Sequence, residues 1–152
     1  QGVGEIFCLP KTAWSPTSYK RLVPGTKAPT DLLWSSRREN ALLRIPPVRG
    51  MRTRVEYRGA DGSSNPYLLL ALCLEAGLDG IRNHREIPEG QSGGRLPGSL
   101  LAAMEHFNRD SFVKDTLGEA LCRRYSACRE EEWRRYERQV TGWELLEYLY
   151  RY

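Results

Sequence analysis

The chain of 152 residues is long enough for one domain with a hydrophobic core, and its composition, 40% hydrophobic and 28% charged, is that of an ordinary soluble globular protein. The net charge of +4 arises from 23 Lys and Arg interleaved with 19 Asp and Glu, which argues against a nucleic-acid-binding stripe. No apolar run approaches the roughly 18–20 residues of a membrane span. The four cysteines lack metal-ligand spacing, so we expect reduced thiols in a cytoplasmic protein with neither a membrane nor a nucleic-acid partner.

The first half of the chain predicts a small sheet. Residues 17–29 are basic and interrupted by prolines, so we expect a loop there and no helix. Strand candidates follow at residues 30–35, 41–46 and 54–58. Because only brief loops join these strands, and parallel pairing ordinarily needs a long crossover, the sequence predicts an antiparallel sheet.

The third strand candidate, residues 54–58, alternates charged and apolar side chains, which sends Glu56 and its two arginine neighbours to one face. The simpler interpretation is a charged solvent face on which arginines neutralise Glu56. The sharper one is an anion and metal site, because the arginine fork suits carboxylate and phosphate oxygens and a carboxylate binds hard divalent cations. Arg21, Arg44 and Arg58 would form a cluster at the same sheet that accommodates phosphate, as in sites of phosphoryl transfer.

A helix is predicted directly after this strand. Asn65 offers a capping side chain, and Pro66 suits the first helical position. Residues 67–74 are apolar nearly all round, which predicts a helix buried on most sides, and Gly77 is expected to end it.

The second half reads as helical. We expect a short helix over residues 99–107, a new start near Asp110, and a long helix over residues 119–140 with a solvated charged face. The aromatic segment 143–152 is expected to dock on its own domain or on a neighbouring molecule.

The predicted fold class is therefore α+β, with an antiparallel sheet carrying the site and helices packed on and beyond it. The chain divides into a sheet and buried helix over residues 1–82, a loop over residues 83–97, and a helical region over residues 98–152 that ends in the docking helix.

Several short motifs occur together in this chain, in a fixed order. They are SYKRLVPG at 18–25, RIP at 44–46, TRVEYR at 53–58, NPYL at 65–68 and AGLDGI at 76–81. In order and spacing these motifs resemble the C-terminal part of the type I glutamine synthetases, and the similarity runs from about residue 16 to residue 152. The α+β prediction agrees with this resemblance.

The resemblance implies an ATP-dependent ligase that joins glutamate and ammonia through γ-glutamyl phosphate, with Mg²⁺ or Mn²⁺, in a ringed homo-oligomer such as a dodecamer. Residue by residue, it makes Glu56 a metal ligand and Arg58 a contact of glutamate and phosphoryl oxygens. Arg44 matches an arginine near the ATP phosphates, and Arg21 matches the loop arginine that orients glutamate. The family's other metal ligands have no counterpart in this chain, so we do not expect it to catalyse alone.

Three positions depart from the family pattern. Lys27 replaces a glutamate thought to help deprotonate ammonium, and a cationic lysine side chain repels that cation. Glu39 replaces an arginine that contacts phosphate, and Thr17 replaces an asparagine. Two alternatives to an ammonia ligase follow: a γ-glutamyl ligase that uses another small amine, and a non-catalytic scaffold.

Overall fold

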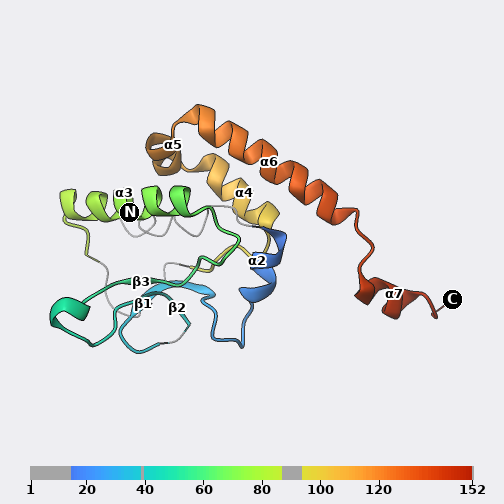
Figure 1. The fold of residues 1–152 in the computed structure, drawn as a ribbon, viewed down its shortest axis with the longest axis horizontal. Coiled ribbons are helices and arrows are strands. Elements are labelled where there is room, and N and C mark those ends of the chain that lie inside the picture. Colours follow the sequence, from blue (N-terminus) through green and yellow to red (C-terminus); the bar gives the residue numbers. More distant parts are fainter. Residues whose placement is uncertain (1–14, 39, 87–93, 152) are drawn as a thin grey trace.

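The computed structural model describes residues 15–38, 40–86 and 94–151, in which a small sheet is followed by a run of helices (Figure 1). This mixed α and β architecture agrees with the predicted class. The elements, in chain order, are α2 Pro16–Arg21, β1 Asp31–Ser35, β2 Ala41–Arg44, the 3-10 helix η2 Gly50–Arg52, β3 Glu56–Tyr57, α3 Pro66–Arg82, α4 Leu100–Arg109, α5 Ser111–Leu117, α6 Glu119–Glu137 and α7 Gly142–Tyr148.

The sheet has the order β1-β2-β3, and only one of its two pairings is antiparallel. β2 and β3 pair antiparallel as predicted, whereas β1 and β2 pair parallel, so the prediction was wrong for the first pair. Five residues, 36–40, join β1 to β2. For β2 to pair parallel with β1, this connection must run back along the length of β1. That length is about 13 Å for five residues, and an extended connection of five residues reaches about 20 Å. These short strands therefore pair parallel without a helical crossover.

The predicted loop at residues 83–97 ends in contact with the sheet. The Leu32 amide donates to the Gly94 carbonyl and the Leu96 amide donates to the Thr30 carbonyl, both at 2.9 Å. Asp31 and Arg95 form an antiparallel bridge beside β1. This segment therefore covers the free edge of β1; residues 87–93 of the loop lie outside the described residues.

The segment predicted as a loop at residues 17–29 begins with a helix, α2, so the prediction was wrong there. Pro16 stands in the first turn, where a missing N–H costs nothing. Tyr19 and Leu22 are buried against Leu100 and Met104 of α4. This burial stabilises a six-residue helix that would be marginal alone, which is why the sequence pattern did not predict it.

Helix α3 begins where it was predicted, because the Asn65 side chain accepts hydrogen bonds from the Tyr67 and Leu68 amides. It does not end at Gly77 but continues to Arg82, and the left-handed residue beyond it is His84, with φ 48°. A glycine inside a helix costs only about 0.5–1 kcal/mol relative to alanine, so Gly77 alone does not stop the helix.

The expectation that this helix is buried on most sides was also wrong for the described chain. Only Leu72 and Ala76 of α3 are buried, in a core that includes Phe107, Val113 and Cys122. Five other large apolar side chains of α3 are exposed: Tyr67, Leu70, Leu74, Leu78 and Ile81.

The later helices follow the predictions closely. Ser99 and Asp110 cap α4 and α5 through their side chains, and Gly118, with φ 79°, separates α5 from α6. Thr141 and Glu144 form a capping box at α7. None of the residues of α7 is buried, and Figure 1 shows it apart from the other elements beyond the end of α6. Docking of this helix on its own described domain is thus not observed.

The cysteines in the described part of the chain, Cys73, Cys122 and Cys128, carry free thiols. Burial raises the pKa of the Cys73 and Cys122 thiols, so neither is poised as a thiolate nucleophile. Cys8 lies outside the described residues. Among the described helices, none combines the length and apolar character needed to cross a membrane.

Candidate functional site

Glu56 lies between two arginines, but only one of them, Arg54, is a neighbour that the alternation along the strand predicted; the other is Arg44 of β2. Arg44 stands opposite Glu56 in the antiparallel β2–β3 register, and its Nη1 lies 3.4 Å from Glu56 Oε2. Arg54 Nη2 lies 2.7 Å from Glu56 Oε1. The Glu56 side chain is 28% exposed and the arginines are about half exposed, so these ion pairs orient the three groups more than they stabilise the fold.

Arg58 ties the end of β3 to the loop that follows α2. Its Nη2 donates a hydrogen bond of 3.1 Å to the Lys27 carbonyl. Two residues along a strand are about 7 Å apart, so Arg58 lies one pleat beyond Glu56 along the same segment. The Lys27 backbone makes this contact with Arg58, whereas the Lys27 side chain is exposed.

Arg21, at the last position of α2, reaches back to the turn after β3. Its Nη2 donates to the Gly59 carbonyl at 2.6 Å and to the Ala60 carbonyl at 3.2 Å. Arg21 thus reaches from the α2 segment to the β3 segment, and Arg58 reaches from the β3 segment to the loop after α2. Glu39, the remaining candidate, lies outside the described residues.

Two guanidinium atoms at this junction are buried and lack a hydrogen-bond partner within the described chain: Nε of Arg21 and Nη1 of Arg58. Buried donors of this kind are nearly always satisfied in folded proteins, and an unpaired charged donor is costly. An oxygen acceptor brought against either atom would satisfy it. The sequence predicted arginines here, but their burial and their unpaired atoms follow from packing that the sequence does not show.

Sequence reasoning missed a hydroxyl cluster beside this junction. Asp61 accepts hydrogen bonds from the Ser63 amide and hydroxyl at 2.8 and 2.6 Å. The Ser63 hydroxyl also lies 3.0 Å from that of Ser18 and 3.1 Å from that of Ser15. The signal was the Asp-Gly-Ser-Ser turn before the Asn65 cap, which favours local side-chain hydrogen bonds. This cluster fixes α2 to the start of α3.

Asp61 predicts an acid sensitivity of folding. Partial burial opposes its charged form, but hydrogen bonds from Ser63 and Ser18 and the charge of Arg21 outweigh burial, so the pKa of Asp61 is below its ordinary value. A lowered folded-state pKa gives stability that is complete above the unfolded pKa, near 3.9, and lost as pH falls through the folded value. Urea unfolding from pH 6 to pH 2.5 should show this loss. Asp61→Asn should flatten that part of the pH profile, and an identical profile in the variant would contradict the assignment.

A complete metal site is not present among the described residues. No group of three or more His, Cys, Asp or Glu side chains is placed to bind a metal ion within residues 15–38, 40–86 and 94–151. Glu56 is a single carboxylate whose oxygens both contact arginines. This segment can supply one carboxylate to a divalent cation, which would need its other ligands from elsewhere.

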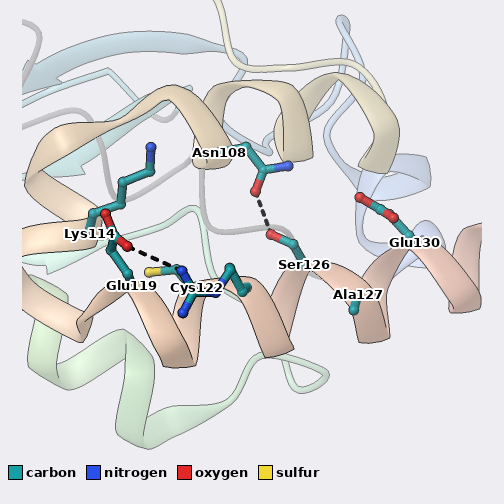
Figure 2. A pocket seen from close by; sticks show the side chains of 8 residues that line it. Asn108, Lys114, Glu119, Cys122, Ser126, Ala127 and Glu130 are labelled. Carbon is teal, nitrogen blue, oxygen red and sulfur yellow. Dashed lines mark hydrogen bonds and ion pairs between the residues drawn. The ribbon is translucent and has the colours of Figure 1, made fainter.

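A separate open cavity of about 470 Å³ lies among α4, α5 and α6 (Figure 2). Its polar groups pair with one another: Arg123 with Glu119 at 3.2 Å, and the Ser126 hydroxyl, which donates to the Asn108 side chain. The buried Cys122 thiol faces the Val113 carbonyl. The predicted site residues do not line this cavity, and we assign it no catalytic role.

Comparison with known proteins agrees with the geometry of β2, β3 and α2. Residues 6–148 match the family model described as glutamine synthetase, catalytic domain. The chain belongs to the glutamine synthetase family. The match covers the sheet, the arginine junction and nearly all of the helical region, so the resemblance of the short motifs reflects shared ancestry over the whole described fold.

Similar relatives come from bacteria and archaea and carry the name glutamine synthetase. The chain is 43% identical over 148 residues to the protein of Thermotoga maritima, an alignment that covers 88% of this chain and 34% of the relative. It is 42% identical over 150 residues to that of Clostridium saccharobutylicum (89% and 34%) and 41% identical over 147 residues to that of Methanosarcina mazei (87% and 33%). The chain therefore spans about a third of the length of the relatives it matches.

Proposed function

We propose that this chain supplies the C-terminal part of the active site of an ATP-dependent ligase that joins glutamate to ammonia or a small amine. The observation that carries the proposal is the junction of Arg21 and Arg58, where each arginine has a buried guanidinium donor without a partner in the described chain and Arg58 follows Glu56 by two residues along the strand. Such a site suits an anionic substrate that carries carboxylate and phosphoryl oxygens. Membership of the glutamine synthetase family supports the same reaction class.

In the proposed reaction, the γ-carboxylate of glutamate attacks the γ-phosphorus of ATP to give γ-glutamyl phosphate and ADP. The amine then attacks the acyl carbon and inorganic phosphate leaves. Arg21 and Arg58 orient the glutamate and phosphoryl oxygens, and Arg44 contacts the phosphates. Glu56 positions Arg44 through its ion pair, and it is the residue that would offer a carboxylate oxygen to Mg²⁺ or Mn²⁺; the bound ion would neutralise phosphate charge.

The identity of the amine is the open part of this proposal. The Lys27 carbonyl accepts a hydrogen bond of 3.1 Å from Arg58 Nη2, so the backbone that carries this lysine lies beside the proposed glutamate site. A cation there disfavours an ammonium ion. Because the family has a glutamate at this position, its replacement by Lys27 makes a ligase with a changed acceptor pocket the second candidate function. A non-catalytic scaffold is the third.

The test uses a single polypeptide in which the part of the Thermotoga maritima relative that this chain does not match precedes residues 1–152. We call it the joined protein. With glutamate, ATP and Mg²⁺, we expect amide product from ammonia or from one member of a panel of small primary amines. Folded joined protein that gives no product with any acceptor would favour the scaffold.

Lys27→Glu in the joined protein tests the acceptor assignment. Removing the cation and adding a base at this position should raise kcat/KM for ammonia at least tenfold, because a positioned general base contributes on the order of 10²–10⁴ in rate. Steady-state kinetics with ammonia and methylamine measures the effect. The matched control is Lys20→Glu, because Lys20 is an exposed lysine on α2 whose Nζ packs over Tyr136. Equal effects of the two substitutions would remove Lys27 from the acceptor site.

Assembly into a homo-oligomer is proposed from the family, and α7 is the proposed contact. Trp143 is 64% exposed and Leu146 is 79% exposed, so this helix presents an apolar surface that nothing in the described chain covers. Removing residues 142–152 from the joined protein should lower the oligomer mass in light scattering. An unchanged mass would exclude α7 as the contact. The cytoplasmic location also remains a proposal.

A further inference from the structure

Three serines and one aspartate join α2 to the turn that follows β3. Ser63 is the centre of this group: its hydroxyl donates to Asp61 Oδ1 at 2.6 Å, and it lies 3.0 Å from the Ser18 hydroxyl and 3.1 Å from the Ser15 hydroxyl. We call these four residues the serine bridge. Ser18 is buried, with 2% of its surface exposed, whereas Ser63 is exposed. The bridge is therefore anchored on the α2 side.

The same two segments also meet at Arg21. Ser18 lies three residues before Arg21, which places both side chains on the same face of α2. Arg21 Nη2 donates to the carbonyls of Gly59 and Ala60, the two residues directly before Asp61. The serine bridge and the arginine contacts are thus two adjacent links between one face of α2 and one turn.

The two carbonyls that accept from α2 are fixed at both ends. On the strand side, the Arg58 amide donates to the Leu42 carbonyl at 2.9 Å. On the other side, Asp61 closes a turn, because its side chain accepts from the Ser63 amide at 2.8 Å and its carbonyl accepts from the Ser64 amide at 3.1 Å. The position of these carbonyls relative to α2 therefore depends on the serine bridge.

The contacts that hold Arg21 do not neutralise it. Carbonyl acceptors carry no net charge, and the two of them use the hydrogens of Nη2 alone. Nε of Arg21 stays buried without a partner in the described chain. A guanidinium that neutral groups hold in place keeps its attraction for an anion, and it loses little side-chain freedom when the anion binds.

We propose that Ser18 and Ser63 are positioning residues for Arg21. Their bridge sets the place of the turn after β3, and the carbonyls of that turn orient the guanidinium toward a carboxylate oxygen of glutamate. Neither serine touches the substrate in this arrangement. The inference rests on the proposed function for the identity of the ligand, and it goes beyond that function in naming the residues that hold Arg21 in place.

Ser63→Ala in the joined protein removes the centre of the bridge. We expect the KM for glutamate to rise about tenfold or more, because a displacement of about 1 Å costs up to about 10²-fold in rate. The KM for ATP should stay near that of wild type. A role in folding alone would lower the amount of active protein, and so kcat, without changing the KM for glutamate. An unchanged KM for glutamate in Ser63→Ala would overturn the inference.

Thr17→Ala is the matched control. Thr17 is an exposed residue of α2, and its hydroxyl contacts that of Ser15 at 2.7 Å, a contact within the start of the helix. The substitution removes a hydroxyl from the same helix and leaves the link between Ser18 and Ser63 in place, so it should not change the KM for glutamate. An equal rise in Thr17→Ala and Ser63→Ala would overturn the inference.

Three further variants show whether the serines act through Arg21. Ser18→Ala breaks the bridge from the α2 side and should reproduce the rise in KM, while Ser63→Thr keeps the hydroxyl and should restore the wild-type KM. Lysine cannot form the forked contacts of arginine, so in an Arg21→Lys background Ser63→Ala should raise the KM for glutamate no further. A full additional rise in that background would overturn the inference.

A chemical readout separates this inference from the proposed function. Phenylglyoxal modifies arginine side chains, and peptide mass spectrometry gives its rate at Arg21 in folded joined protein whether or not the protein turns over. Ser63→Ala should raise that rate several-fold relative to Arg123, which is exposed on α6. Faster modification in a joined protein without turnover supports the inference and rejects the ligase. Turnover with an unchanged KM for glutamate and an unchanged modification rate rejects the inference alone.

Discussion

Glu56→Gln in the joined protein is expected to lower kcat at least a hundredfold, with little change in the unfolding temperature. The amide keeps the size of the side chain but removes the charge that orients Arg44 and Arg54. It also removes the only carboxylate that the described β3 segment offers to a divalent cation. Loss of a preorganised charged group in an active site typically costs about 10²–10³ in rate. Turnover at several Mg²⁺ concentrations measures the effect.

Glu75→Gln is the matched control for this prediction. Glu75 on α3 also pairs with an arginine, Arg82, at 2.7 Å, and its side chain is 38% exposed, against 28% for Glu56. The α3 pair is remote in sequence from the arginine junction and should be nearly silent in turnover. A loss of activity in Glu75→Gln equal to that in Glu56→Gln would mean that both substitutions act through folding.

Gly59→Ala is expected to destabilise the chain by about 1–3 kcal/mol, the usual cost of overpacking. Gly59 is buried at the turn after β3, and a Cβ there would lie 2.5 Å from the Tyr57 Oη, 2.8 Å from its Cζ and 3.0 Å from Leu42 Cδ1. The Tyr57 ring packs against both apolar clusters of the protein and cannot move away freely. Urea unfolding of wild type and variant measures the difference.

Tyr57→Phe provides the control in the same experiment. The Tyr57 hydroxyl is buried without a hydrogen-bond partner in the described chain, and burial raises the pKa of this phenol well above its ordinary value. Removing an unpaired buried hydroxyl should be neutral or stabilising. Gly59→Ala should cost less in the Tyr57→Phe background than in wild type. Equal costs in both backgrounds would show that the short contact with the hydroxyl does not determine the effect.

Sequence patterns predicted the elements best where local chemistry determines them. The Asn65 cap with Pro66, the Ser99 cap and the break at Gly118 each act within one turn of helix, so the starts of α3, α4 and α6 were predictable. The ion pair of Glu56 with Arg54 followed from the period of two in the strand, whereas its pair with Arg44 depends on the β2–β3 register. Local periodicity and capping are the parts of folding that a sequence displays directly.

Features that depend on distant contacts were not predictable in this way. The parallel β1–β2 pairing depends on how a five-residue connection turns, and α2 depends on burial of Tyr19 and Leu22 under α4. Gly77 failed as a stop signal because a glycine inside a helix costs only about 0.5–1 kcal/mol, and α3 continues to Arg82. The hydrogen bonds from Arg21 to the carbonyls of the turn after β3 depend on where that turn lies, which local patterns in the sequence do not show.

The most direct test of the ligase assignment is glutamate-dependent phosphate release by the joined protein in the absence of any amine. Without an acceptor, γ-glutamyl phosphate cyclises to 5-oxoproline and phosphate, so this measurement isolates phosphoryl transfer from the choice of amine. We predict ATP-derived phosphate and 5-oxoproline in equal amounts, lost in Glu56→Gln. A folded joined protein that consumes no ATP when glutamate and Mg²⁺ are added would contradict the assignment.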